Sequence, residues 1–395
     1  MTTQAKTGRV PELDGLRVLM IFIVSWYHIW QQSWMAPAAD ILGIRINLDW
    51  LVRSGYVWVD GTVLLSAFLL YLPLARRGRS ELPDVKAFYL RKARRILPDY
   101  WLILLIVFLG ICLPWNLYNG NGPFLAKDLF THLTLIFPYW RDTYIYTPLG
   151  AASWTLSVVA QAYLLFPLLA KAMRKHPAAT LATLCTAAFA FRAWCLWGMT
   201  DYSMVVKTFV NFLDVYALGF GCALLFAKLE SLPEPAGRRR WLRPAAATLV
   251  FAGCLTGLCL LLDVQAYQPD HAALQGLQMM LRPVFALCFA GLILSAPFSF
   301  RPLRKLLGNR VTAFLAAISM NYYLLHQTLA VHLRRIGFPP SVSETPNLQL
   351  EQPWQSWYTL AAFGFSFIAA TLVTYGVKAL LAALKRRNAA KEVRG

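Results

Sequence analysis

The stretch AAATLVFAGCLTGLCLLLDV, residues 245–264, contains a single charged side chain, that of Asp263. A helix of this length rises by about 30 Å, which is the thickness of the hydrocarbon core of a bilayer. Lipid offers no hydrogen-bond partners to backbone amides, so a segment that crosses it is expected to be helical. This stretch therefore predicts an integral membrane protein.

Similar apolar runs recur along the 395 residues, of which 58% are hydrophobic and 14% are charged. Soluble domains contain about 25% charged residues, so few segments of this chain have a side that faces water. We predict an all-α, polytopic transmembrane helical bundle of about ten spans, located in the cell membrane. The expected spans cover residues 16–34, 54–73, 98–114, 153–173, 178–198, 206–227, 245–264, 277–296, 311–332 and 357–384.

The net charge of +19 comes from 38 Lys and Arg against 19 Asp and Glu. The N-terminal tail and the segments after even-numbered spans contain 28 of the 38 basic residues, and the opposite loops contain 6. Short cytoplasmic loops are enriched in Lys and Arg, so this bias predicts that both termini are cytosolic. The basic residues are then explained by the lipid bilayer, and we expect no nucleic-acid partner.

The apolar runs fill the chain, which indicates one integral membrane domain without an appended soluble domain. Its expected parts are a cytosolic tail at 1–15, the spans within 16–384 and a second cytosolic tail at 385–395. The seven cysteines lie in or beside apolar runs, and none has the spacing to histidines that a zinc site needs. We therefore expect no metal site.

Several polar side chains lie at a common depth inside the expected spans, about 8–12 Å below the outer boundary by helix rise. Ionisable groups inside a span are costly, so each one is a candidate for function. A shared depth predicts one buried polar cavity in the outer half of the bundle. The side chains at this level are His28, Asp60, Ser157, Gln161, Arg192, Asp214, Arg282 and His326.

Each ionisable group also has a structural interpretation. We favour His28 as a functional residue, whereas His326 fits equally well as an interhelical hydrogen-bonding partner. Asp60 can neutralise Arg192 or Arg282, or it can orient His28 as a carboxylate orients a general base, and both interpretations stay open. We expect the two arginines to be counter-ions rather than catalysts.

Arg17 lies eleven residues before His28, which is three helical turns, so both face the same side about 16 Å apart. Arg17 either anchors the helix end or contributes to an anion site. The segment with Arg91, Arg94 and Arg95 precedes the third span and can contact lipid headgroups or hold a phosphate group. This placement suits a long anionic donor that enters from the cytosol.

These stretches together resemble the motifs of membrane-bound acyltransferase family 3, in the right order over most of the chain. Each motif is short, and the set is more specific than any one of them. The matching stretches are Glu12–Arg17 with His28, Asp60–Leu70, Tyr89–Trp101, Trp154–Ser157 with Gln161, Tyr163 and Pro167, and Tyr322–His326.

The resemblance implies transfer of an acyl group, usually acetyl, from cytosolic acyl-CoA to a hydroxyl of a carbohydrate or lipid-linked acceptor at the outer side. It implies that His28 is the catalytic base and that Arg17, Arg91, Arg94 and Arg95 serve the donor. Our hypothesis adds Asp60 as a supporting carboxylate and Ser157, or a nearby arginine, as the group that stabilises the oxyanion. The residues expected to bind substrate are Trp154, Gln161 and His326.

The chain departs from the family pattern at two motifs. Val159 and Ala160 stand where the fourth-helix motif has a Glu, and Ala67 replaces a Gly of the second-helix motif. The loss of the Glu either changes the acceptor or indicates a member without catalysis. A transporter or flippase of a glycan or amphiphile precursor is the alternative from another class, because it also needs a buried polar cavity.

Overall fold

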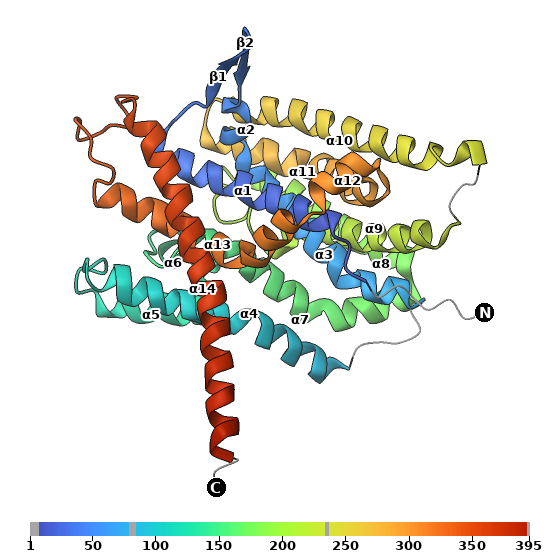
Figure 1. Cartoon of the computed structure of the whole chain (residues 1–395), viewed down its shortest axis with the longest axis horizontal. Coiled ribbons are helices and arrows are strands. Elements are labelled where there is room, and N and C mark those ends of the chain that lie inside the picture. The colour runs from blue at the N-terminus through green and yellow to red at the C-terminus, as the bar shows by residue number, and fades with distance from the viewer. Residues whose placement is uncertain (1–7, 79–83, 234–236, 393–395) are drawn as a thin grey trace.

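The computed structural model describes residues 8–78, 84–233 and 237–392 (Figure 1). Residues 1–7 of the expected N-terminal tail and 393–395 of the expected C-terminal tail lie outside this range. Over the described residues the chain is almost entirely helical, with one two-stranded sheet. The predicted all-α membrane bundle is therefore confirmed.

Within the described part of the chain, nine helical segments are long and apolar enough to cross a bilayer. Each corresponds to one of the predicted spans, and most extend a few residues beyond the predicted bounds. Their helices are α1 (Glu12–Ser33), α3 (Trp58–Arg76), α4 (Val85–Val107), α7 (Trp154–Lys175), α8 (Pro177–Gly198), α9 (Leu213–Ser231), α10 (Leu242–Ala266), α11 (His271–Ser295) and α14 (Trp354–Glu392).

The predicted span 311–332 forms α13 (Arg310–Arg335), which has the length of a span but too polar a composition to be counted with the nine. Its 26 residues rise about 39 Å, enough to cross the hydrocarbon core. α13 packs against both α1 and α14 and buries polar side chains such as Asn321 and His326. Neighbouring helices cover these polar groups, so α13 does not need an apolar surface all round.

The central helices are α1 and α3, which pack against each other. α3 also contacts α9 and α11, and 78% of its most apolar window is buried against protein, compared with 17% for α10. α10 therefore presents most of its apolar surface outward, as a lipid-facing helix does. Figure 1 shows α14 crossing the bundle at a steep angle over α13.

Close approach of α3 and α9 depends on Gly219. A Cβ atom at this position would lie 2.6 Å from the Cβ of Ala67 and 2.9 Å from the carbonyl oxygen of Leu64. Neither distance is tolerated between these atoms, so the contact requires glycine. Small residues at helix interfaces are the usual route to tight packing in membranes.

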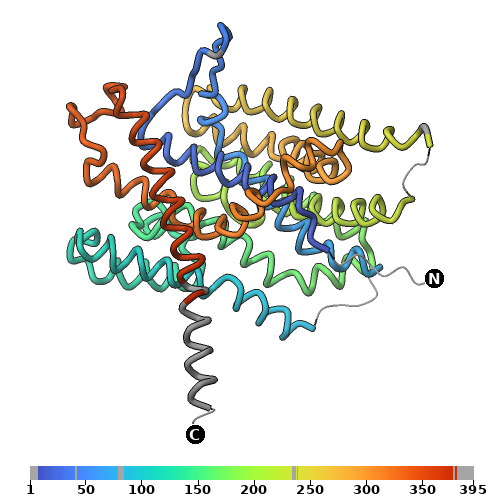
Figure 2. The backbone as a smooth tube through the Cα atoms, viewed as in Figure 1, coloured from blue at the N-terminus to red at the C-terminus, as the bar shows by residue number. Residues whose placement is uncertain are grey.

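The bundle has two different ends. In Figure 2 the N-terminal end of α1 lies at one end, and the connections 113–150 and 336–353 lie at the opposite end. The charge bias assigns these connections to the outer side, and the placement agrees with that assignment. The cytoplasmic location of both termini stays a prediction.

A β-hairpin after α1 was not predicted from the sequence. Strands β1 (Ala38–Ile41) and β2 (Ile44–Asn47) pair antiparallel through a turn at Leu42 and Gly43, which both have positive φ. Such a two-residue turn matches the twist of a hairpin. The remaining short elements are α2 (Asp49–Arg53), α5 (Gly122–Leu133), α6 (Arg141–Ile145), α12 (Arg301–Leu307), the 3-10 turns η1 (Gly55–Val57), η3 (Phe137–Tyr139), η4 (Ala151–Ser153), η5 (Phe209–Phe212), η6 (Gly237–Arg239) and η7 (Ala296–Phe298), and the π turn η2 (Phe108–Cys112).

Candidate active site

A cavity of about 240 Å³ surrounds His28 in the outer half of the bundle, as the polar level predicted. We call it the His28 cavity. Helices α1, α3, α7, α11 and α13 contribute to its wall, together with the connections before α7 and α9. Its polar lining consists of Tyr27, His28, Gln31, Tyr56, Asp60, Tyr144, Lys207, His271, Gln275, Gln278, Arg282 and Gln327.

The imidazole of His28 is held through its Nδ1 atom, which lies 2.9 Å from Oε1 of Gln31. The amide of Gln31 is oriented because its Nε2 donates to the hydroxyl of Tyr27 at 3.0 Å. An amide oxygen can only accept, so Nδ1 bears the proton and Nε2 is left as a basic nitrogen. Nε2 of Gln327 approaches the same Nδ1 atom at 3.4 Å, a longer contact. The shorter contact, to the amide oxygen of Gln31, corresponds to the tautomer that a general base requires.

His326 lies next to this imidazole, with 5.2 Å between the two ring centres. Its Nδ1 atom donates to the carbonyl of Tyr323 at 2.7 Å, and its buried Nε2 atom has no hydrogen-bond partner. The ring is fully buried and does not line the His28 cavity. His326 therefore packs beside His28 without lining the cavity, which fits a positioning residue better than the predicted contact with substrate.

Asp60 lines the His28 cavity, and its carboxylate is engaged by Arg282, with 3.1 Å between Nε and Oδ2. The guanidinium of Arg282 also donates to the carbonyl oxygen of Val206 at 3.0 Å. In the described structure no hydrogen bond joins Asp60 to His28, whose Nδ1 partner is Gln31 instead. The geometry therefore favours the charge-neutralising interpretation of Asp60 over its interpretation as a carboxylate that directly orients His28.

The second buried ion pair joins Arg192 to Asp214. Together with the Asp60–Arg282 pair, this pair leaves each of the two buried arginines bound to a carboxylate. The expectation that Arg192 and Arg282 are counter-ions agrees with this pairing.

Lys207 and Tyr144 belong to the site, although the sequence analysis did not select them. The ammonium of Lys207 donates to the hydroxyl of Tyr144 and lies 5.8 Å from the ring centre of Trp154. Burial lowers the pKa of Lys207 to about 8. Lys207 follows α8 in a connection outside the apolar helices, so a search restricted to charges deep inside spans overlooks it.

Ser157 and Gln161 do not line the His28 cavity. The hydroxyl of Ser157 donates to the carbonyl oxygen of Leu135 at 2.5 Å, and Gln161 accepts a hydrogen bond of 2.5 Å from Tyr139. These contacts tie α7 to the outer connection. The oxyanion role expected for Ser157 and the substrate contact expected for Gln161 do not fit this placement. Trp154, on another face of the same helix, does line the cavity.

A second cavity, of about 580 Å³, lies toward the N-terminal end of α1 and is lined by Arg17, Lys92 and Arg95. We call it the Arg17 cavity. Asp14 also lines it and forms an ion pair of 2.7 Å with Arg9. Four cations and the two carboxylates of Asp14 and Asp99 surround this space, so it has a net positive charge. It suits an anionic ligand.

The predicted donor-binding arginines divide between two faces of α4. Arg95 lines the Arg17 cavity, together with Lys92 one turn earlier, because residues three apart share a helix face. Arg91, Arg94 and Arg95 are all exposed, and of these three only Arg95 lines the cavity. The contact of Arg91 and Arg94 with the buried part of a donor is therefore not supported, whereas contact with its outer part or with lipid headgroups remains compatible with the structure.

The two cavities follow one another along the same helices. On α1 Arg17 lines the Arg17 cavity and His28 lines the His28 cavity, and α3, α7 and α13 likewise contribute to both. Between them, the hydroxyl of Tyr323 donates to the carbonyl oxygen of Ala152 at 2.7 Å and accepts a 2.9 Å hydrogen bond from Thr155. Polar groups of two helices thus form the partition that a reacting group would have to pass.

This arrangement can be compared with known proteins. A sequence profile of the acyltransferase domain, acyltransferase 3, matches residues 10–376. The chain belongs to this acyltransferase family. The family predicted from the motifs is therefore confirmed, and so is acyltransferase as the expected enzyme class at the level of the family.

Two relatives show how far the acyltransferase likeness extends. The chain is 25% identical over 395 aligned residues to the peptidoglycan O-acetyltransferase OatA of Listeria monocytogenes. The alignment covers 94% of this chain and 55% of the relative. A Staphylococcus aureus (strain COL) protein with the provisional name of an O-acetyltransferase is 23% identical over 177 residues, covering 42% of this chain and 26% of that protein. The chain thus spans about half the length of the first relative. No solved structure matches it.

The departure from the acyltransferase family pattern at Val159 can now be placed. Val159 lines the Arg17 cavity, whereas Ala160 packs against the cluster of apolar residues around α4. A carboxylate at position 159 would add negative charge beside Arg17 and Lys92. Its absence therefore alters the charge of the Arg17 cavity, and it removes nothing from the wall around His28.

Proposed function

We propose that this acyltransferase-family protein moves an acetyl group from cytosolic acetyl-CoA to a hydroxyl of a carbohydrate acceptor at the outer side of the membrane. The observation that supports it is the alignment of the two cavities on shared helices. A cation-lined space opens toward the end assigned to the cytosol, and a smaller space with an oriented imidazole lies beyond it. The relative's name, peptidoglycan O-acetyltransferase, supports a carbohydrate acceptor.

Arg17, Lys92 and Arg95 hold the phosphates of the donor, since guanidinium and ammonium groups bind phosphate oxygens strongly. The extended arm of the donor brings its thioester past Tyr323 toward His28. Nε2 of His28 then takes the proton of the acceptor hydroxyl while that oxygen attacks the thioester carbonyl. The C–O bond forms, the C–S bond breaks, and the thiolate leaves with the proton that His28 returns.

Lys207 is the group that we assign to the negative charge that develops on the carbonyl oxygen. A cation fixed in a cavity shielded from water stabilises such an oxyanion more than it would in water. Lys207 has a hydroxyl and two aromatic rings as neighbours, and no carboxylate among the described residues pairs with it. Its charge is therefore available to the reaction, unlike the charges of Arg192 and Arg282.

The assignment of His28 is tested with purified protein in lipid nanodiscs, acetyl-labelled acetyl-CoA and a carbohydrate acceptor. His28→Ala should lower the rate of labelling by about 100–10,000-fold, the usual contribution of a general base. The control is His271→Ala, which removes a second imidazole of the same cavity wall. Wild-type activity in a folded His28→Ala protein contradicts the proposal. In sealed vesicles, uptake of an unmodified glycan without acetyl transfer would instead support the transporter alternative.

A further inference from the structure

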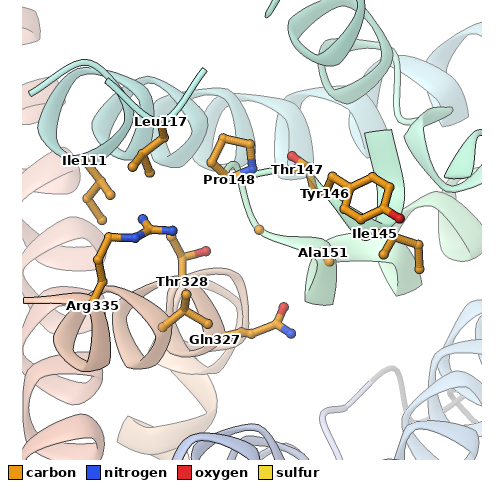
Figure 3. A pocket seen from close by; sticks show the side chains of 12 residues that line it. Ile111, Leu117, Ile145, Tyr146, Thr147, Pro148, Ala151, Gln327, Thr328 and Arg335 are labelled. Carbon is orange, nitrogen blue, oxygen red and sulfur yellow. The ribbon is translucent and has the colours of Figure 1, made fainter. Parts of the chain in front are cut away.

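A third cavity, of about 330 Å³, adjoins the His28 cavity on its outer side (Figure 3). We call it the Arg335 cavity. The two cavities share Ile145, Ala151 and Gln327 in their walls. Ligand pockets for drug-sized molecules have volumes of roughly 300–1,000 Å³, so the Arg335 cavity has room for one unit of a larger ligand.

One face of α13 supplies the polar groups of this cavity. Thr328 and Arg335 are seven residues apart, which is two helical turns, and Val331 lies between them. Figure 3 shows the guanidinium of Arg335 extending into the space beside Thr328, opposite Pro148. No carboxylate in the described residues pairs with Arg335. Arg335 is an exposed residue, and its cation borders this concave space without a protein counter-ion, an arrangement that suits an anionic ligand.

Thr328 provides the second observation. Its side chain is 93% buried, and its Oγ1 atom has no hydrogen-bond partner. A buried hydroxyl without a partner costs free energy that a bound ligand can restore. Gly150 faces this hydroxyl with a φ of +113°, and a Cβ there would lie 2.6 Å from Oγ1. The hydroxyl is therefore closed off beneath the Gly150 backbone, at a position where no side chain fits.

The opposite wall is fixed by hydrogen bonds of the outer connection. The hydroxyl of Thr147 donates to Oδ2 of Asp128 at 2.8 Å, and Tyr118 donates to the same oxygen at 2.8 Å. The backbone amide of Leu149 donates to Thr147 at 3.0 Å. Asp128 is fully buried, so the wall is positioned before any ligand binds.

We propose that the Arg335 cavity binds an anionic unit of the acceptor, adjacent to the unit whose hydroxyl reaches His28. This inference rests on the proposed function and narrows the acceptor to a negatively charged glycan. Arg335 holds a carboxylate or a phosphate through its forked donors, and Thr328 forms part of the wall beside it. Gln327, between the two cavities, lies where the linkage between the units passes.

The test measures binding as well as transfer, with purified protein in nanodiscs. The probes are a disaccharide of glucose and glucuronic acid and its glucuronamide counterpart, which differ only in charge. Wild-type protein should bind the acid at least tenfold more tightly than the amide. Arg335→Gln should remove this preference, and Arg335→Lys should restore part of it. The control is Arg45→Gln, which removes an exposed cation of the hairpin and should change nothing.

Transfer is then measured with both probes for wild type and Arg335→Gln. The substitution should raise KM for the acid by about tenfold or more, the size of one charge-assisted hydrogen bond, with kcat and the KM of the amide unchanged. Equal binding of acid and amide by wild type, or a preference that survives Arg335→Gln, overturns the Arg335 site. Binding that depends on Arg335 without acetyl transfer to either probe overturns the proposed function instead.

Discussion

Lys207 differs from the other buried cations in the partners available to it. Arg282 and Arg192 each pair with a carboxylate, whereas Lys207 contacts a phenol hydroxyl and aromatic rings. Burial lowers the pKa of Lys207 from its ordinary value to about 8. Its charge is therefore present at neutral pH and is lost as the pH rises through about 8.

This titration predicts how the rate depends on pH. If the Lys207 cation stabilises the oxyanion, kcat/KM of the wild type falls as the pH rises through about 8. Lys207→Arg keeps a cation at all accessible pH values, so the alkaline decline should move to higher pH. Lys207→Met should lower kcat by about 100–1,000-fold, as removal of an oxyanion donor does. The measurement is a pH–rate profile for each variant.

The matched control is Lys127→Arg, which makes the same exchange in the outer connection, where Lys127 pairs with Asp142. This variant should keep the wild-type profile. An identical alkaline decline in wild type and Lys207→Arg would assign the titration to another group and remove Lys207 from the mechanism.

Depth along the helices predicted part of the site. His28, Asp60 and Arg282 share a level, and the structure brings them to one cavity. Depth does not determine which face of a helix a side chain occupies, so Ser157 was placed in the site although it points to the outer connection. Lys207 was missed because it lies at the outer edge of the predicted span 206–227, outside the level at which the other polar side chains were selected.

Among the secondary-structure elements, the membrane spans were predicted from the length of the apolar stretches alone. α13 was also predicted, although its more polar composition separates it from the other nine helices. The hairpin β1–β2 was not predicted, because its four-residue strands are too short for alternation to be distinctive. The direction of α14 depends on tertiary packing against α13, which no local pattern encodes.

The contact between α3 and α9 predicts a specific destabilisation. Gly219→Ala places a methyl group against Leu64 and Ala67, so it should lower the free energy of unfolding by about 1–3 kcal/mol, as overpacking does. The control is Gly253→Ala on α10, where no atom lies within 4 Å of the added Cβ. Thermal unfolding in detergent should show a lower Tm for the first variant only. Equal Tm values would contradict the tight contact between α3 and α9.

For the whole molecule, the charge distribution and the positions of the cavities indicate the same orientation in the membrane. Basic residues concentrate in the segments that follow even-numbered spans, and the cation-lined Arg17 cavity lies at the N-terminal end of α1. The opposite end bears the hairpin, the 113–150 connection and the Arg335 cavity. The sequence predicted this polarity, but the alignment of the Arg17 and His28 cavities along four shared helices became visible only in the folded bundle.

The most direct measurement uses sealed vesicles that contain the protein with its cytosolic face outward and a carbohydrate acceptor trapped inside. Labelled acetyl-CoA, which does not cross the bilayer, is added outside. The account predicts label on the trapped acceptor with wild-type protein and none with His28→Ala. Label that forms only when donor and acceptor are on the same side of the membrane would contradict transfer from the Arg17 cavity to the His28 cavity.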